Sequence, residues 1–195
     1  MQSDEFKTIS ISGEGTYSVF RSKFLAFSHH ISSVDEAMDI IANYRKKYYD
    51  ARHVCYAYVL GVDHRISRAN DDGEPSSTAG KPILGQINSN ELTDSLIIVV
   101  RYYGGINLGT SGLIVAYRMA AAEAINASTI ITKLDEDTIT YRFTYPMMNS
   151  VMRVIKDMNP RIESQNFDNT CEIKLAIRKS KAEELLQKLN KLDFE

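Results

Sequence analysis

The sequence has only two cysteines, and no apolar run comes near the roughly 18 residues that a membrane-spanning helix needs. Cys55 and Cys171 each lie in an apolar, strand-like run, in parts of the chain that we expect to form separate domains. Buried, reduced thiols are therefore expected rather than a disulfide or a metal pair. Residues 1–12 carry acidic side chains where a signal peptide has a basic start and an apolar run. We expect a cytoplasmic protein without a membrane partner.

An excess of positive charge is also missing. Lys and Arg number 23 against 25 Asp and Glu, which gives a net charge of −2, and there is no polybasic tail. Nucleic-acid-binding proteins usually carry a basic footprint, so any contact with RNA or DNA must come from a local cluster. The composition, 44% hydrophobic and 25% charged, is that of a globular chain with one large or two small domains.

The histidines and cysteines lack the spacing of metal ligands. His29, His30 and His64 form no ligand pattern with His53 or with the cysteines, so a structural zinc site is not expected. No complete set of nucleophile, base and orienting residue stands out either. The sequence therefore predicts neither a metal nor another cofactor.

The chain does contain a glycine-rich turn between a buried strand and a helix. Residues 95–100 are an apolar, β-branched run, and residues 113–125 carry apolar side chains at helical spacing. The glycines of the turn are Gly104, Gly105, Gly109 and Gly112. They allow positive φ angles and a close approach to another surface. With Thr110 or Ser111 as the cap, the first N–H groups of the helix would suit an anion.

Neither familiar phosphate-binding signature fits this turn. The glycines do not follow G-x-G-x-x-G spacing, and Thr110 stands where a Walker loop needs its lysine. The same glycines also suit a purely structural turn that packs on a neighbouring loop. Both interpretations stay open.

A second segment, residues 68–81, combines acids, hydroxyls and a lysine. Its candidate binding residues are Asp71, Asp72, Glu74, Ser76, Thr78 and Lys81. Gly73 and Pro75 indicate a turn, and Pro82 opens a short helix at 82–88. The carboxylates could bind a cation or serve in acid–base chemistry, and the same residues also suit an ordinary polar loop.

The remaining pattern of the amino-terminal part predicts strands and one further helix. Alternation indicates strands at 6–12, 17–20 and 22–31. A capping box that begins at Ser33 opens a helix at 34–49. His53 heads a strand at 53–61 and is a candidate base or anion contact, although histidines at strand ends often only pack.

The carboxy-terminal part follows a different pattern after an acidic linker at 135–137. We expect a strand at 138–145, a helix from Pro146, strands at 161–167 and 170–178, and a closing helix at 181–192. This βαββα order is typical of a ferredoxin-like unit without its last strand, so one sheet edge should be short or open.

Three stretches together resemble one known family. They are DARHVCYAY (50–58), DDGEPSSTAGKPIL (71–84) and VVRYYGGINLGTSGLIVAY (99–117). In this order they are similar to the IMPACT/YigZ family, specifically its bacterial YigZ-type members, and the resemblance covers essentially the whole chain. It implies an α+β protein with two domains. Residues 1–134 would resemble the second domain of a small-subunit ribosomal protein and domain IV of elongation factor G, and residues 135–195 would be ferredoxin-like.

Three positions depart from the family pattern. Ser77 and Ser111 stand where glycines are usual, and Val115 stands where a lysine or arginine is common. The loss of that cation weakens the case for phosphate binding at this position, while Lys81 and Arg101 remain.

The resemblance implies a non-enzymatic, translation-linked regulatory protein that binds RNA, the ribosome or a regulatory protein partner. In this hypothesis the two motif loops form one surface. The expected phosphate contacts are Lys81, Arg101, Thr110 and the amides of residues 109–112, with Tyr102 and Tyr103 available to stack on bases.

Two alternatives stay open. A hydrolase-like, peptidase-like or nucleotide-binding enzyme would use Asp72, Glu74 and His53. In the other alternative the motifs are structural, with Asp72 and Glu74 capping the turn amides of residues 104–112. The hypotheses differ in whether the two loops create an exposed surface.

Overall fold

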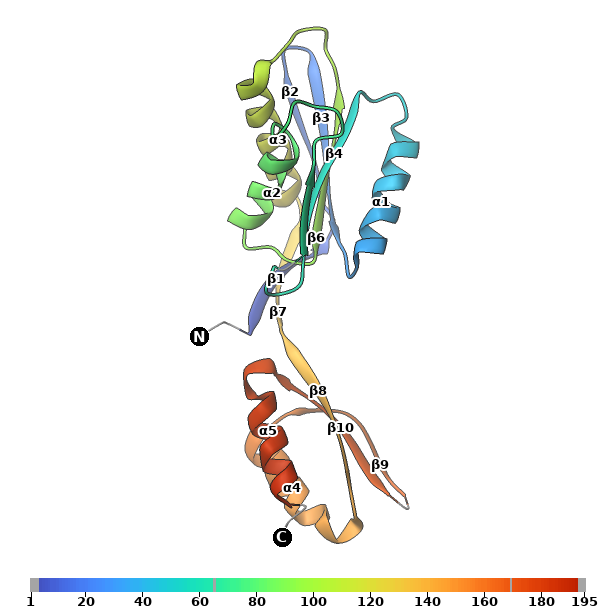
Figure 1. Ribbon diagram of the computed structural model, residues 1–195, viewed down its shortest axis with the longest axis vertical. Coiled ribbons are helices and arrows are strands. Elements are labelled where there is room, and N and C mark those ends of the chain that lie inside the picture. Colours follow the sequence, from blue (N-terminus) through green and yellow to red (C-terminus); the bar gives the residue numbers. More distant parts are fainter. Residues whose placement is uncertain (1–3, 65, 169, 193–195) are drawn as a thin grey trace. The chain divides into compact units, whose positions relative to one another are not determined.

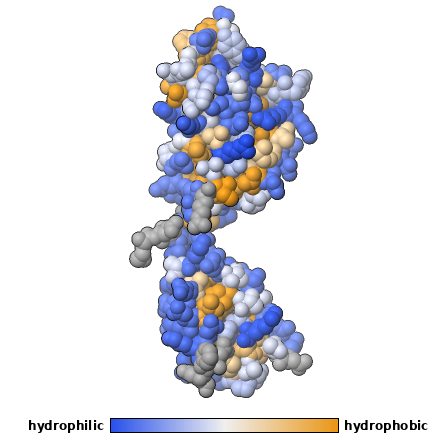
Figure 2. Space-filling model, viewed as in Figure 1, coloured by the Kyte–Doolittle hydropathy of each residue, from blue (hydrophilic) through white to orange (hydrophobic). Residues whose placement is uncertain are grey.

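The computed structural model describes residues 4–64, 66–168 and 170–192 (Figure 1). The chain divides into two compact units, a larger one of residues 6–133 and a smaller one of residues 1–5 and 134–195. Among the described helices, none is long and apolar enough to cross a membrane. On the face drawn in Figure 2, hydrophilic side chains cover most of both units and apolar ones gather in separate patches.

The larger unit is built on a five-stranded antiparallel sheet with the strand order β2-β3-β6-β4-β5. Its strands are β2 (Glu14–Val19), β3 (Ser22–His30), β4 (His53–Leu60), β5 (Ile66–Asn70) and β6 (Ser95–Tyr102). The apolar runs of β4 and β6 are buried because these strands lie inside the sheet with helices on both faces. The sequence did not predict β5, whose residues are polar or partly exposed.

Helices cover both faces of this sheet (Figure 1). They are α1 (Val34–Lys47) on one face, and α2 (Gly80–Ser89) and α3 (Gly109–Asn126) on the other. Alternate residues of β4 point to opposite faces, so Tyr56 packs in the core beside α1 and Cys55 in the core beside α2 and α3. The remaining strands up to residue 134, β1 (Glu5–Ile11) and β7 (Thr129–Leu134), form a separate two-stranded sheet.

The start of α3 differs from the sequence prediction. The helix begins at Gly109, and Leu108 occupies the cap position without a side-chain hydrogen bond to the helix. Thr110 and Ser111 lie inside the first turn, so the prediction that one of them caps the helix was wrong. The sequence pattern did not predict this first turn as helical, because the turn is rich in glycine and Gly is a poor helix former.

The smaller unit places two helices against a three-stranded antiparallel sheet of order β8-β10-β9. Its elements are β8 (Glu136–Phe143), a 3₁₀ turn (Tyr145–Met147), α4 (Met148–Met158), β9 (Arg161–Phe167), β10 (Cys171–Arg178) and α5 (Lys179–Lys191). The acidic linker predicted at 135–137 was wrong, because β8 begins at Glu136. Both cysteines are free and buried, as predicted.

Candidate functional site

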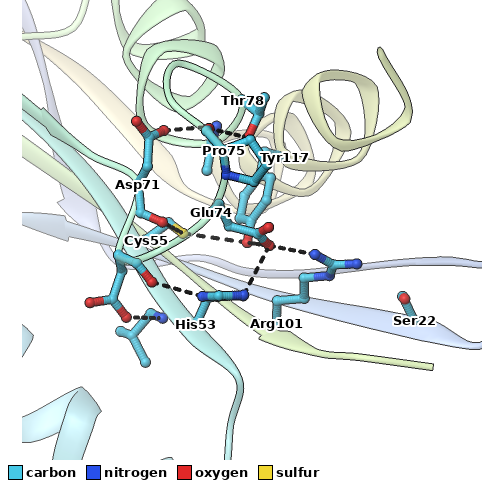
Figure 3. A network of polar contacts seen from close by, with 12 residues as sticks. Ser22, His53, Cys55, Asp71, Glu74, Pro75, Thr78, Arg101 and Tyr117 are labelled. Carbon is cyan, nitrogen blue, oxygen red and sulfur yellow. Dashed lines mark hydrogen bonds and ion pairs between the residues drawn. The ribbon is translucent and has the colours of Figure 1, made fainter. Parts of the chain in front are cut away.

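The two motif segments meet at the side chain of Glu74 (Figure 3). Its Oε1 accepts hydrogen bonds from Nη1 of Arg101, at 2.6 Å, and from the hydroxyl of Tyr117, at 2.7 Å. Arg101 lies near the end of β6 and Tyr117 lies on α3, so Glu74 ties the acidic segment to both sides of the glycine-rich turn. All three side chains are buried, which makes this contact internal.

His53 supports the same turn from the start of β4. Its Nδ1 lies 2.7 Å from the carbonyl oxygen of Asp72. A carbonyl oxygen only accepts, so Nδ1 carries the proton of this hydrogen bond. The other ring nitrogen, Nε2, lies 3.7 Å from Oε1 of Glu74. The histidine therefore bridges the backbone of the turn and the buried carboxylate.

Cys55 and Tyr117 line the network without supplying an activated nucleophile. The thiol of Cys55 donates to the carbonyl of Asp71 at 3.0 Å and lies 3.3 Å from the hydroxyl oxygen of Tyr117. Burial raises the pKa of the Cys55 thiol well above its usual value. Burial, together with Cys55 and Glu74, also raises the pKa of Tyr117. Both groups remain protonated, so neither attacks a substrate as a thiolate or phenolate.

Asp71 caps the amino-terminal end of α2. Its Oδ1 accepts from the N–H groups of Ala79, at 3.0 Å, and Gly80, at 2.8 Å. Its Oδ2 accepts from the N–H of Ser77 at 2.8 Å. A carboxylate in this place satisfies the free donors and the positive end of the helix dipole. These backbone donors of α2 are thus occupied from within the chain.

Asp72 is also engaged internally. Its Oδ1 accepts from Nη2 of Arg45 at 2.8 Å, and its Oδ2 accepts from the N–H of Val54 at 2.7 Å. The side chain therefore joins the acidic turn to α1 and β4. The expectation that Asp72 and Glu74 cap the amides of residues 104–112 was wrong, because both carboxylates accept from other groups.

The glycine-rich turn packs closely on the hairpin between β2 and β3. A Cβ atom on Gly104 would lie 2.1 Å from the backbone carbon of Arg21, and the N–H of Gly104 donates to Oγ of Ser22 at 3.1 Å. Only glycine permits this approach. Gly109 has a φ of +68°, and its N–H donates to Oδ1 of Asn107 at 3.0 Å. One amide of the predicted 109–112 cradle is therefore already bonded within the turn.

A hollow of about 360 Å³ lies between α2 and α3. Its lining residues are Ser77, Lys81, Pro82, Gly85, Gln86, Ile114 and Arg118. Lys81 and Arg118 are exposed, and neither makes an ion pair with any residue in the described part of the chain. The sequence prediction included Lys81 and missed Arg118. The available signal was its helical spacing from Ile114, which puts both residues on one face of α3.

The predicted site residues fall into three classes by exposure. Glu74, Thr78 and Arg101 are buried; His53, Asp71, Asp72, Tyr102, Gly104 and Gly112 are partly exposed; and Ser76, Lys81, Gly105, Gly109 and Thr110 are exposed. Thr78 donates to the carbonyl of Pro75 at 2.6 Å, and Tyr102 donates to Oδ1 of Asp50 at 2.9 Å. Within the described residues, no group of three or more His, Cys, Asp or Glu side chains could hold a metal ion.

Residues 20–125 match the model of the Impact N-terminal domain. The IMPACT family member YvyE of Bacillus subtilis is 40% identical over 119 residues, which are 61% of this chain and 55% of that protein. The IMPACT family member YigZ of Escherichia coli is 31% identical over 171 residues, 87% of this chain and 84% of that protein. A crystal structure titled only as a hypothetical protein has a TM-score of 0.69 at 28% identity, and the match covers 98% of this chain and 93% of that one. It shares the mixed α/β fold.

Proposed function

Because the chain belongs to the IMPACT family, as its motifs predicted, we propose that it is a non-enzymatic protein of translation regulation that binds RNA. The proposed binding surface consists of the hollow between α2 and α3 and the exposed part of the glycine-rich turn. Free RNA and the RNA of a ribosome both suit this surface, since the phosphate backbone offers the same chemistry in both.

The proposal depends on one pair of side chains, Lys81 and Arg118. Both line the same hollow and neither is neutralised by a described acidic residue. Such cations donate hydrogen bonds to phosphate oxygens, and a guanidinium can hold a phosphate with two hydrogen bonds. The hydroxyl of Ser77 and the amide of Gln86 add neutral donors to the lining. The net charge of −2 is compatible with this site because the cations are concentrated locally.

Arg101 is less available than Lys81 to bind a phosphate. The guanidinium is paired with Glu74 inside the protein, and the residue is only 5% exposed. We propose that Arg101 instead holds the turn in shape. Arg118 takes its place as the second cation of the surface.

Tyr103 is the better candidate for stacking on a base. It is 51% exposed, and its ring centre lies 5.4 Å from the guanidinium carbon of Arg101, which supports the ring from one side. Tyr102 is less exposed and its hydroxyl is bonded to Asp50. An exposed aromatic ring favours single-stranded RNA, whose bases are free to stack.

No observation favours the enzyme alternative. Asp72 and Glu74 are held by donors from the protein, and the pKa values of Cys55 and Tyr117 are raised rather than lowered. The Nδ1–H group of His53 already donates a hydrogen bond to the backbone carbonyl of Asp72. The arrangement is that of a structural network that ties the two motif segments together.

Fluorescence anisotropy with a labelled single-stranded RNA at low ionic strength tests the proposal. We expect Lys81→Ala and Arg118→Ala each to weaken binding several-fold, and Tyr103→Ala to weaken it roughly tenfold through lost stacking. Lys133→Ala and Tyr145→Ala remove an exposed lysine and an exposed tyrosine elsewhere and should change little. Absence of RNA binding, or equal losses in the control variants, would overturn the proposal.

A further inference from the structure

The turn between β2 and β3 holds two residues in an unusual backbone conformation. The antiparallel ladder pairs Val19 with Ser22, so Phe20 and Arg21 form the turn between them. Their φ angles are +44° and +65°, and a two-residue hairpin turn with positive φ at both positions is of type I′. Asn-Gly is the usual pair in such a turn, because a left-handed backbone strains residues with bulky side chains. Phe20 and Arg21 therefore cost the chain stability.

Neither of these side chains is packed into the protein. Phe20 is 66% exposed, and Arg21 is exposed as well. Within the described part of the chain, the ring has no aromatic partner, and the guanidinium has neither a hydrogen bond nor an ion pair. Strained backbone conformations cluster at sites that clamp ligands. The strain and the exposure together point to a use of this turn outside the fold.

The β2–β3 turn lies directly against the glycine-rich turn (Figure 1). A Cβ atom on Gly104 would lie 2.4 Å from the carbonyl oxygen of Arg21, so the two backbones touch at this point. The residue before each of them is an exposed aromatic one, Phe20 before Arg21 and Tyr103 before Gly104. Consecutive Cα atoms are about 3.8 Å apart, so both rings start one residue from the same backbone contact. The proposed stacking residue Tyr103 thus has a second exposed ring in its neighbourhood.

We infer that Phe20 is a second base-stacking residue of the RNA surface and that Arg21 contacts a phosphate beside it. The inference rests on the proposed function and specifies its ligand. The ligand is a single-stranded RNA with two unpaired bases, one on Tyr103 and another on Phe20. A ring face stacks on every base, so these contacts give no base preference. A double-stranded RNA keeps its bases paired and offers neither ring a partner.

The charges near the ring favour a nucleic acid over an apolar protein surface. Arg21 and Lys23 follow Phe20 closely, are exposed, and have no acidic partner among the residues that the structure describes. An apolar protein surface would remove water from these cations without supplying an opposite charge, which costs free energy. Phosphates on either side of a stacked base supply that charge. A strand of RNA therefore suits both the ring and the cations.

Substitution of Phe20 in the full chain separates binding from folding. Asparagine suits the left-handed backbone, so Phe20→Asn should raise the thermal midpoint. The same variant should bind a fluorescein-labelled single-stranded oligouridylate roughly tenfold more weakly, because a stacked base loses its ring. Phe20→Tyr keeps a ring in the strained position and should bind like the wild type. Tyr49→Asn removes another ring, 86% exposed beyond the end of α1, and should leave the affinity unchanged. A merely structural Phe20 would not combine higher stability with weaker binding.

Substitution of Arg21 tests the phosphate contact. Glycine relieves the strain at this position and removes the charge, so Arg21→Gly should also raise the thermal midpoint. The slope of log affinity against log salt concentration should become shallower by about 0.7, the share of one phosphate contact on a single strand. Lys133→Ala, which removes an exposed cation elsewhere, should leave the slope unchanged. An unchanged slope in Arg21→Gly would overturn the phosphate contact.

These measurements distinguish the inference from the proposed function. If the wild type does not bind the oligouridylate, both fail. If Lys81→Ala weakens binding and Phe20→Asn does not, the proposed RNA surface stands and the inference is overturned, which leaves the exposed ring for a protein partner. A lower thermal midpoint in Phe20→Asn, or an equal loss of affinity in Phe20→Tyr, would overturn it as well.

Discussion

Oε1 of Glu74 and Nη1 of Arg101 lie 2.6 Å apart, with both side chains almost completely buried. The guanidinium carbon also lies 5.5 Å from the ring centre of Phe24 and 5.4 Å from that of Tyr103. A buried ion pair contributes little net stability over apolar side chains of similar size, but its geometry is demanding. We interpret this pair as the contact that fixes the glycine-rich turn against the acidic segment.

Removal of one partner of this pair should destabilise the protein strongly. Arg101→Met leaves a buried carboxylate without its cation, and we expect the free energy of unfolding to fall by about 3 to 5 kcal/mol. Urea unfolding followed by circular dichroism measures this change. Lys174→Ala, which breaks an exposed pair with Glu163, should cost far less. Similar losses in both variants would refute the structural role of Arg101.

Asp71→Ala should destabilise α2, because three backbone N–H groups lose their shared acceptor. The expected loss is about 1 to 2 kcal/mol in urea unfolding. Asp71→Asn keeps one acceptor oxygen, so its free energy of unfolding should lie between those of Asp71→Ala and the wild type. Asp35→Ala provides the control, since Asp35 lies in the first turn of α1 and Ser33 supplies the cap there. If Asp71→Ala is neutral, the cap has no energetic role.

Ser77→Gly should stabilise the chain slightly. Ser77 has a φ of +66°, a left-handed conformation that costs residues with a Cβ atom roughly 1 to 2 kcal/mol. Glycine removes that strain but adds about 0.5 to 1 kcal/mol of unfolded-state entropy, so the expected gain is about 0 to 1.5 kcal/mol. Ser76→Gly, at a neighbour without positive φ, should destabilise. Thermal unfolding measures this: the midpoint of Ser77→Gly should be higher than that of Ser76→Gly. A higher midpoint for Ser76→Gly would contradict this explanation.

Stability should decline in mild acid because of His29. Burial lowers the pKa of His29, whose Nε2 lies 2.9 Å from the hydroxyl of Tyr44. Burial also raises the pKa of Tyr44 to about 12, so that group stays neutral. Below the ordinary histidine pKa of 6.5 the unfolded chain binds a proton before the folded one does, and stability is lost as the pH falls. Urea midpoints at about pH 7.5 and 5 should differ less in His29→Gln than in the wild type; equal differences would exclude His29 as the cause.

Periodicity predicted most of the fold, and its failures have local reasons. The capping box at Ser33 and the apolar run after Ser95 gave α1 and β6. In contrast, β5 is short and mostly polar, and it owes its place to pairing with β4, which no local pattern reveals. The first turn of α3 is glycine-rich and has the apolar Leu108 at its cap position, so tertiary contacts rather than propensity form it.

The candidate site could be predicted only in part. Sequence motifs singled out both segments, and the structure joins them through Glu74 and Arg101. Sequence cannot tell whether such a pair points inward or toward a ligand, because the same two charges suit either place. Arg118 was missed because a lone arginine on a helix is usually a solvated side chain. Arg118 becomes a candidate only in the folded chain, where Lys81 of α2 lines the same hollow.

The salt dependence of RNA binding tests the central proposal most directly. Each cation that neutralises a phosphate of single-stranded RNA adds about 0.7 to the slope of log affinity against log salt concentration. The slope of the Lys81→Met/Arg118→Met double variant should therefore be shallower than that of the wild type by about 1.4. The same slope in both proteins, with RNA still bound, would show that these two cations do not contact phosphate.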